Sequence, residues 1–240
     1  MEKVDRNLVP HNETKFDTPE GDSNDTTALY KKLTLYDALK NSYNDSKTQK
    51  KSMKEFGYYR DKQLSNDNTQ VYYNPYEKKL LNTVTGTHNL SDVGTDLYLA
   101  TGHLKDTNRY KEAKDTLEKA KKKYGVDNAT IVGHSLGSSI SNNIASRDKD
   151  KVIGLDGGYT IGQKTRANTT NYRSAGDLVS ALGANAKHMT TLQNGNIISN
   201  HKYALAGGLL GGGVGALIGA GVDALQSHNV DNIKNNNIFV

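Results

Sequence analysis

The feature that most constrains the fold is a Gly-x-Ser-x-Gly pattern, Gly-His-Ser-Leu-Gly at positions 133–137. The residues before it, 129–132, are rich in β-branched side chains and predict a buried strand. The residues after it, 136–147, have the apolar spacing of a helix. A strand, a tight glycine-flanked turn and a helix form a nucleophile elbow. We therefore expect Ser135 to be a nucleophile, and a coincidental or inactivated turn is the alternative.

The elements around this elbow predict the fold class. Segments 71–73 and 80–85 have the composition of an antiparallel strand pair. A charged helix is expected over 107–124, ending at Gly125. Further strands are expected at 152–155, 169–173, 188–192 and 196–199, the last two flanking the hairpin signal Asn194-Gly195. Strands that alternate with helices predict an α/β fold with a mostly parallel sheet covered by helices on both faces.

The N-terminal part of the chain differs in composition from the rest. Residues 1–25 are polar and are expected to form a flexible arm, whereas apolar residues recur at helical spacing from Thr26 to Tyr43. We expect residues 26–240 to form a single domain. The arm has no apolar core of a signal peptide, and the chain has no cysteine. These observations predict a protein that is not secreted by a signal peptide and stays in the cytoplasm.

The charge balance is mildly basic, with a formal net charge of +5. Lys119 and the lysines at 121–123 form the densest basic cluster, at the expected C-terminal end of a helix, where cations suit the helix dipole. We interpret this cluster as a solvated helix end. The chain has no aromatic-interleaved basic motif, so we expect no nucleic-acid partner.

Segment 204–222 contains no charged residue and eight glycines. The glycines at 207, 211, 215 and 219 recur every four residues, which allows close approach of another helix. Three interpretations stay open: a buried helix or hairpin, membrane contact, and self-association. The segment lies shortly before His228, which is the candidate catalytic base discussed below. We therefore expect it to pack beside the active-site face as a lid or a lipid-contacting element.

A serine nucleophile needs a histidine base and a carboxylate that orients it. Asp177 follows the strand expected at 169–173, at the edge of the sheet that the serine occupies. Asp156 follows the preceding strand and is the alternative acid. Among the downstream histidines we favour His228, with His201 and His188 as alternatives.

The oxyanion of an ester-cleaving reaction needs two backbone N–H donors. Leu136 directly follows the nucleophile and supplies the first candidate. The second is Thr87, in the loop that follows the strand at 80–85. An ordinary strand-to-helix turn is the alternative interpretation of that loop.

The chain resembles the class 3 lipases, the fungal-type family of the α/β-hydrolases, over roughly residues 71–233. The family's aromatic-Arg-Gly-Ser/Thr oxyanion motif resembles Val-Thr-Gly-Thr at 84–87, and its Gly-His-Ser-Leu-Gly-Gly elbow resembles 133–138. Its Asp-x-Val-Pro/Ser turn resembles 177–180, and its late histidine resembles His228. The chain departs from the family in having Thr85 and Ser138 where the family has Arg and Gly. The chain also resembles lipase-like proteins of large DNA viruses and their satellites, which implies a virion-associated location as the alternative to a cytoplasmic one.

This resemblance implies a serine esterase with an α/β-hydrolase-like fold that cleaves acylglycerol or phospholipid without a metal or an organic cofactor. Ser135, Asp177 and His228 would be its catalytic residues, and Thr87 and Leu136 its oxyanion hole. The competing prediction is a catalytically silent scaffold that acts in membrane interaction or virion assembly. The partners expected are a lipid or ester substrate and a membrane surface contacted through 204–222; the oligomeric state stays open.

Overall fold

The computed structural model describes residues 30–44, 53–87, 104–158, 168–174, 177, 180, 189–192 and 228–240. They contain a seven-stranded sheet in the order β1-β2-β3-β4-β5-β6-β7. The strands are β1 (Tyr59–Arg60), β2 (Thr69–Asn74), β3 (Lys79–Val84), β4 (Thr130–His134), β5 (Lys151–Leu155), β6 (Thr169–Ser174) and β7 (Met189–Leu192). The pairs β1–β2 and β2–β3 are antiparallel, and the four pairs from β3 to β7 are parallel. The predicted mostly parallel sheet is confirmed.

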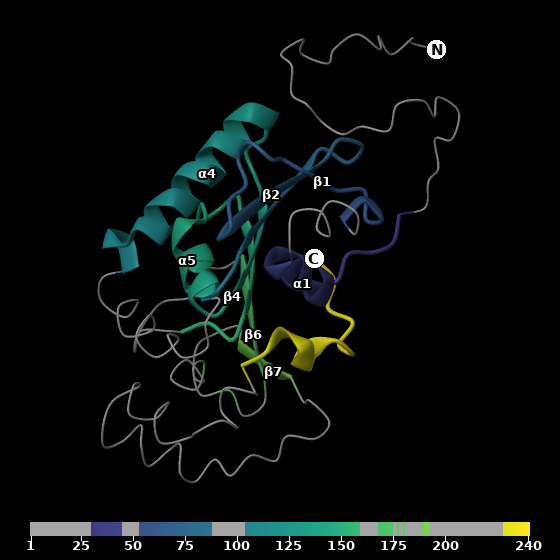
Figure 1. Cartoon of the computed structure of the whole chain (residues 1–240), viewed down its shortest axis with the longest axis vertical. Helices are drawn as coiled ribbons and strands as arrows, with labels where there is room; N and C mark the ends of the chain where they lie inside the picture. Colours follow the sequence, from purple (N-terminus) through teal and green to yellow (C-terminus); the bar gives the residue numbers. More distant parts are fainter. Residues whose placement is uncertain are drawn as a thin grey trace.

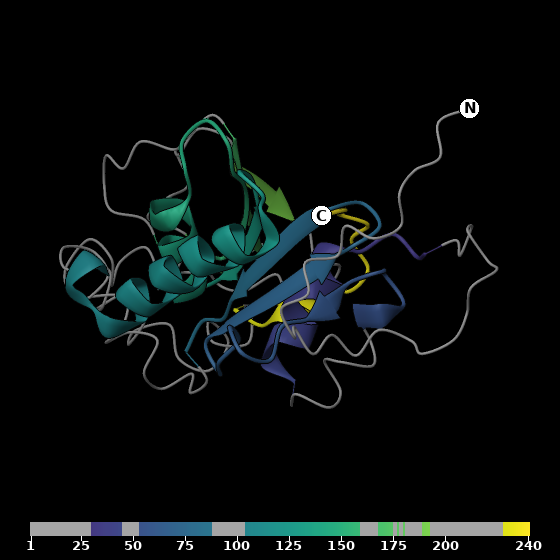
Figure 2. The ribbon, with the colours of Figure 1, turned by 90° about the horizontal axis from the view of Figure 1, so that it is seen from above.

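Helices cover both faces of this sheet (Figure 1). In the described residues the helices are α1 (Leu35–Tyr43), α4 (Asn108–Tyr124) and α5 (Leu136–Ile144), with short 3₁₀ turns at η2 (Leu104–Asp106) and η4 (Val230–Ile233). Figure 2 shows α4 on one side of the strands, and α1 together with the C-terminal segment on the other. The architecture is that of an α/β-hydrolase-like fold.

Side chains that alternate between the two faces of the sheet form two hydrophobic cores, one on each face. Leu80 and Ile131 face α4 and α5, and their neighbours Leu81 and Val132 face α1 and η4. Successive side chains of a strand point to opposite faces, so strands covered on both sides need apolar residues in succession. The buried runs of β3, β4 and β5 have this composition because each of their faces carries a helix.

The element boundaries differ from the sequence prediction in three places. Helix α1 begins only at Leu35, since Thr34 caps it with its side-chain oxygen and pairs with Phe239 in a β-bridge. Helix α5 ends at Ile144, shorter than the segment 136–147 that the pattern predicted. Strand β7 pairs parallel with β6, and its predicted hairpin partner lies outside the described residues.

The basic cluster at the end of α4 is more than a solvated helix end. Lys121 pairs with the fully buried carboxylate of Asp150 at 2.6 Å, and Lys123 pairs with Asp61 at 2.7 Å. Both lysine side chains are largely covered. The interpretation from sequence was wrong for these two residues because their acidic partners lie far away along the chain.

The sequence predictions that fall outside the described residues include the arm at 1–25, the strand at 196–199 and the glycine-rich segment 204–222. Within the part of the chain that the structure describes, no helix is both long and apolar enough to span a membrane.

Candidate active site

Ser135 lies in the turn between β4 and α5 in a strained backbone conformation, with φ 55° and ψ −128°. Non-glycine residues adopt such angles rarely, and the strain is typical of functional turns. Ser135 is the N-cap of α5, but its hydroxyl makes no capping hydrogen bond. Thr34 and Thr107, the N-caps of α1 and α4, do cap their helices with side-chain oxygens. The Ser135 hydroxyl is therefore not committed to its own helix.

The two glycines of the elbow are required by close backbone contacts. A Cβ at Gly133 would lie 2.4 Å from the carbonyl oxygen of Gly137. A Cβ at Gly137 would lie 2.1 Å from the carbonyl oxygen of Val84 at the end of β3. Both distances are far below van der Waals contact, so α5 can pack this tightly only on glycine.

The predicted acid and base lie together. Nδ1 of His228 is 2.7 Å from Oδ1 of Asp177, and both side chains are buried. The second oxygen of Asp177 accepts hydrogen bonds from the N–H and the hydroxyl of Ser180. Nε2 of His228 is buried and has no hydrogen-bond partner in the described part of the chain. The imidazole is thus held at one nitrogen and left available at the other.

Electrostatics couples these two groups. Burial alone would raise the pKa of Asp177, but the attraction of His228 and hydrogen bonds from His228 and Ser180 outweigh it and lower that pKa. Burial alone would lower the pKa of His228, but the negative charge and hydrogen bond of Asp177 raise it above the ordinary 6.5. Each partner stabilises the charged form of the other.

The loop after β3 borders the serine. A Cβ at Gly86 would lie 2.7 Å from Cβ of Ser135. The hydroxyl of Thr87, the next residue, is buried and lacks a hydrogen-bond partner among the described residues. Leu136 is the first residue of α5, where N–H groups have no carbonyl of their own helix to bond. Both predicted oxyanion donors therefore belong to segments that adjoin Ser135.

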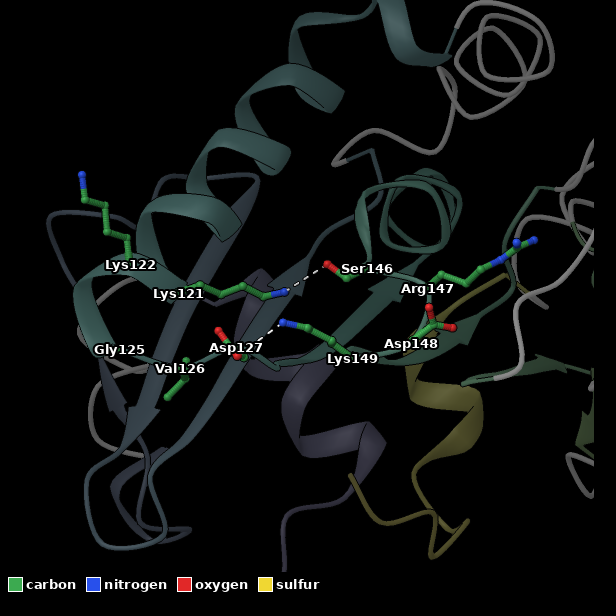
Figure 3. Close-up of a pocket in the computed structure, with 9 residues that line it drawn as sticks. All are labelled: Lys121, Lys122, Gly125, Val126, Asp127, Ser146, Arg147, Asp148 and Lys149. Carbon is green, nitrogen blue, oxygen red and sulfur yellow. Dashed lines mark hydrogen bonds and ion pairs between the residues drawn. The ribbon is translucent and has the colours of Figure 1, made fainter.

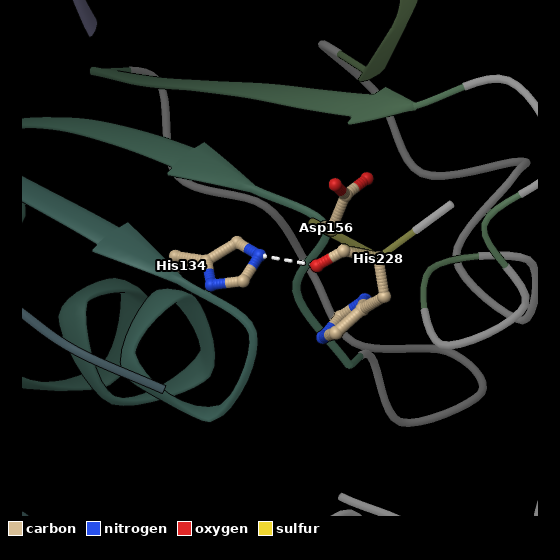
Figure 4. A group of neighbouring side chains, drawn as sticks. All are labelled: His134, Asp156 and His228. Carbon is tan, nitrogen blue, oxygen red and sulfur yellow. Dashed lines mark hydrogen bonds between the residues drawn. The ribbon is translucent and has the colours of Figure 1, made fainter. Parts of the chain in front are cut away.

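His134 connects the elbow to the predicted base. Its Nε2 lies 3.0 Å from the backbone oxygen of His228, and the two rings are 4.9 Å apart between centroids (Figure 4). Its Nδ1 lies 2.8 Å from the hydroxyl of Tyr43. Burial and the charge of His228 lower the pKa of His134 to about 3, so this ring stays neutral.

Asp156, the alternative acid, is also fully buried near these rings. Its carboxyl accepts hydrogen bonds from the N–H and the hydroxyl of Ser174, and Asp177 rather than Asp156 bonds to His228 Nδ1. Burial and the charge of Asp177 raise the pKa of Asp156 to about 8. The carboxyl of Asp156 therefore holds its proton more tightly than that of Asp177, whose pKa is lowered.

His134, Asp156 and His228 bring one potential metal-ligand atom each within 4.8 Å of one another (Figure 4). Both nitrogens of His134 and both oxygens of Asp156 already make hydrogen bonds, and Nδ1 of His228 bonds to Asp177. Only Nε2 of His228 remains without a partner in this group. The donor atoms are thus arranged for a hydrogen-bond network rather than for a cation.

Sequence reasoning missed two residues that contact the site, Tyr43 and Arg109. The hydroxyl of Tyr43 accepts a hydrogen bond from the N–H of Gly86 at 2.7 Å, and Arg109 donates to the carbonyl oxygen of Thr85 at 2.6 Å. No local pattern could have identified them, because they come from helices distant in sequence. The alternative bases His201 and His188 lie outside the described residues.

A concavity of about 630 Å³ lies at the end of the parallel strands opposite to Ser135 (Figure 3). It is lined by segments that precede β4 and β5, whereas Ser135 follows β4. Two of its lysines are paired, Lys121 with Asp150 and Lys149 with Asp127. Lys122 and Arg147 extend away from it in Figure 3, so its charges do not converge on a ligand position.

Comparison with solved structures found fungal lipases. The Lip2 lipase from Yarrowia lipolytica aligns with 15% identity over 66% of this chain and 77% of its own, with a TM-score of 0.46. The Rhizomucor miehei lipase in its propeptide complex aligns with 14% identity over 62% of each chain, with a TM-score of 0.44. No protein-family model matches the chain, and no curated protein matches it. The α/β-hydrolase-like fold is assigned from the sheet order and the strand–turn–helix elbow that carries Ser135.

Proposed function

We propose that this protein is a serine hydrolase that cleaves carboxylic esters of lipids through an acyl-serine intermediate. The observation that carries the proposal is the buried Asp177–His228 pair, whose Nε2 is unpartnered within the described part of the chain. His134, the residue before Ser135, bonds to the backbone oxygen of His228. Ser135 itself has a strained backbone, and its hydroxyl does not cap its helix. A serine of this kind and a carboxylate-oriented histidine are the components that serine hydrolysis needs.

In the proposed reaction, His228 Nε2 takes the proton of the Ser135 hydroxyl as its oxygen attacks the ester carbonyl carbon. His228 then gives this proton to the departing alkoxide, which leaves as an alcohol and leaves the acyl group on Ser135. Water attacks the acyl-enzyme in the same way and releases the carboxylic acid. Asp177 holds the imidazole in one tautomer and stabilises its protonated form.

Negative charge develops on the carbonyl oxygen in both steps. The backbone N–H groups of Thr87 and Leu136 are the proposed donors to this oxygen, and the N-terminal end of α5 adds a favourable dipole. The Thr87 hydroxyl is a third group of suitable chemistry. No metal or organic cofactor takes part in the proposed reaction.

The proposed substrates are acylglycerols or phospholipids, a choice supported by the resemblance of the motifs at 84–87, 133–138 and 177–180 to class 3 lipases. Segment 204–222 remains our proposed lipid-contacting element. Replacing Gly211 and Gly215 with leucine should impair folding or hydrolysis of aggregated lipid. A double variant that matches the unchanged protein in folding, liposome binding and lipid hydrolysis would contradict this role.

The direct test compares hydrolysis of a short p-nitrophenyl ester by the unchanged protein, Ser135→Ala and Ser141→Ala. Ser141 lies on the same helix, and its buried hydroxyl makes no hydrogen bond with the described residues, which makes it a matched control. We expect turnover by the unchanged protein and the control, and none above background by Ser135→Ala. A folded unchanged protein without turnover on soluble or lipid esters would instead support a catalytically silent scaffold.

A further inference from the structure

The direction of the Thr87 N–H depends on how residues 85–87, the oxyanion loop, are held. In a trans peptide the C=O and the N–H point to opposite sides of the backbone. The orientation of the Gly86 carbonyl therefore fixes the orientation of the Thr87 N–H, which belongs to the same peptide unit. Any group that fixes the Gly86 carbonyl by a hydrogen bond therefore also fixes the direction of the Thr87 N–H.

Arg109 holds this carbonyl from one side. It lies in the first turn of α4, and its Nη2 is 2.6 Å from the oxygen of Thr85 and 3.3 Å from the oxygen of Gly86. One guanidinium nitrogen thus bonds to two successive carbonyl groups. The Thr87 N–H consequently points away from Arg109 and α4.

Tyr43 holds the same loop by its amide. The Gly86 N–H donates to the Tyr43 hydroxyl oxygen at 2.7 Å, and this oxygen lies 2.8 Å from Nδ1 of His134. A backbone oxygen only accepts hydrogen bonds, so the proton of neutral His134 is on the Nε2 that faces His228, and Nδ1 accepts the hydroxyl proton of Tyr43. Nε2 donates in turn to the backbone oxygen of His228 at 3.0 Å.

These hydrogen bonds run in one direction through four segments of the chain, Gly86 to Tyr43 to His134 to His228. Burial raises the pKa of Tyr43 to about 12, so its hydroxyl keeps its proton at neutral pH. Burial lowers the pKa of His134 to about 3, so its ring stays neutral. The proton arrangement is therefore fixed across the range in which an esterase works.

We propose that Tyr43 and Arg109 are positioning residues of the oxyanion hole, which together orient the Thr87 N–H and link the oxyanion loop to the backbone of His228. The proposal rests on the ester hydrolysis proposed above. Neither residue needs to contact the substrate. Their effect is on the transition state, where the oxyanion is present, rather than on substrate binding.

The test uses Tyr43→Phe and Arg109→Met, which remove the hydrogen bonds while keeping side chains of similar size. Tyr36→Phe is the control on α1, since the Tyr36 hydroxyl bonds only Asp231 among the described residues. Lys111→Met is the control on α4, because Lys111 also donates to a backbone carbonyl, that of Asp106. The measurements are kcat and KM for a soluble ester, affinity for a trifluoromethyl ketone that forms an oxyanion on Ser135, and the unfolding midpoint.

We expect each test variant to lower kcat by about 10- to 100-fold, below the about 10²- to 10³-fold cost of deleting a donor outright. Affinity for the ketone should fall in proportion, with KM within about twofold, and both controls should match the unchanged protein. Arg109→Lys should recover part of kcat, because an ammonium group can still bond to a carbonyl of the loop. This variant also provides the comparison if Arg109→Met fails to fold.

Folded Tyr43→Phe and Arg109 variants with unchanged kcat and ketone affinity would overturn the proposal, as would a rise in KM without loss of kcat. The failure of the proposed function has a different signature. In that case the unchanged protein itself would neither hydrolyse the ester nor bind the ketone covalently.

Discussion

Each end of the parallel sheet contains a fully buried carboxylate, and the two carboxylates have different partners. At the amino end, Asp150 precedes β5 and pairs with Lys121. At the carboxyl end, Asp177 follows β6 and pairs with His228. Both carboxylate side chains are 0% exposed, so burial of charge does not by itself distinguish a structural pair from a reactive one.

The Asp150–Lys121 and Asp177–His228 pairs differ in whether an atom is left that can still bond or exchange a proton. Both oxygens of Asp150 are bonded, by Lys121 and by the N–H groups of Ala129 and Ser146, and Lys121 also donates to the Ser146 hydroxyl. The partner of Asp177 is a histidine that can lose its proton and whose second nitrogen lacks a partner among the described residues. Under the proposed function, a buried charge belongs to a reactive site when its partner is a histidine that has one nitrogen left to exchange a proton.

The largest difference should appear when each carboxylate is neutralised. Asp177→Asn should lower kcat for ester hydrolysis by about 10³- to 10⁴-fold, because the imidazole loses both its fixed tautomer and the charge that stabilises its protonated form. Folding should largely survive, since asparagine keeps an oxygen that can accept the Ser180 bonds. Ester kinetics and circular dichroism of the purified variant check this, and full activity would remove Asp177 from the mechanism.

Asp150→Asn should have the opposite signature. It leaves Lys121 without its charge partner and should lower the free energy of unfolding by about 3 kcal/mol. The kcat of the folded fraction should remain unchanged. Asp231→Asn, at an exposed pair with Lys40, is the control and should cost less than about 1 kcal/mol. Urea unfolding measures all three proteins, and a stable but inactive Asp150→Asn would break the comparison.

The pH dependence of kcat/KM is a further test of the difference between the two buried pairs. His228 must be neutral to accept a proton. Burial alone would lower its pKa, but the attraction of Asp177, its hydrogen bond and the charge of Asp156 together raise the pKa above 6.5. Activity should therefore be lost as pH falls through a value above 6.5. In Asp177→Asn the residual activity should persist to lower pH, because the stabilising charge is gone. If the activity of the unchanged protein were instead lost only below pH 6.5, Asp177 would not raise the pKa of His228 as proposed.

The smallest expected effect concerns Asp156, whose folded-state pKa of about 8 exceeds its ordinary 3.8. Between these values the unfolded chain releases the proton and the folded chain keeps it, so stability falls as pH rises towards 8. Asp156→Asn mimics the protonated carboxyl and should be more stable than the unchanged protein at pH 8, by about 2 kcal/mol, with little difference near pH 4. Thermal unfolding at the two pH values tests this; a variant that is less stable at pH 8 would show that the carboxylate is ionised in the fold.

Local sequence patterns predicted much of the fold. The β-branched run before 133–137 and the apolar spacing after it predicted β4 and α5, and Gly125, with φ 62°, ends α4 as expected. These features depend on residues close in the chain, for which periodicity and glycine placement are informative. The start of α1 was predicted too early because Leu33 fits the helical spacing but lies in the extended segment before Thr34.

Contacts between distant residues could not be predicted in this way. Chain order and the turn after β6 pointed to Asp177, and the resemblance pointed to His228, which the structure brings together across 51 residues. Nothing in the sequence indicated that Tyr43 would reach Gly86, or that Lys121 would neutralise Asp150. Such pairs arise from the packing of helices on the sheet, which the local pattern does not encode.

The central claim is that Ser135 is an activated nucleophile, and covalent labelling tests it most directly. The unchanged protein is treated with a fluorophosphonate, digested, and analysed by mass spectrometry to locate the phosphonylated residue. We predict one adduct on Ser135, formed far more slowly in Asp177→Asn and at the normal rate in Asp150→Asn. No adduct on the folded protein, or an adduct on another serine with Ser135 unmodified, would contradict the account.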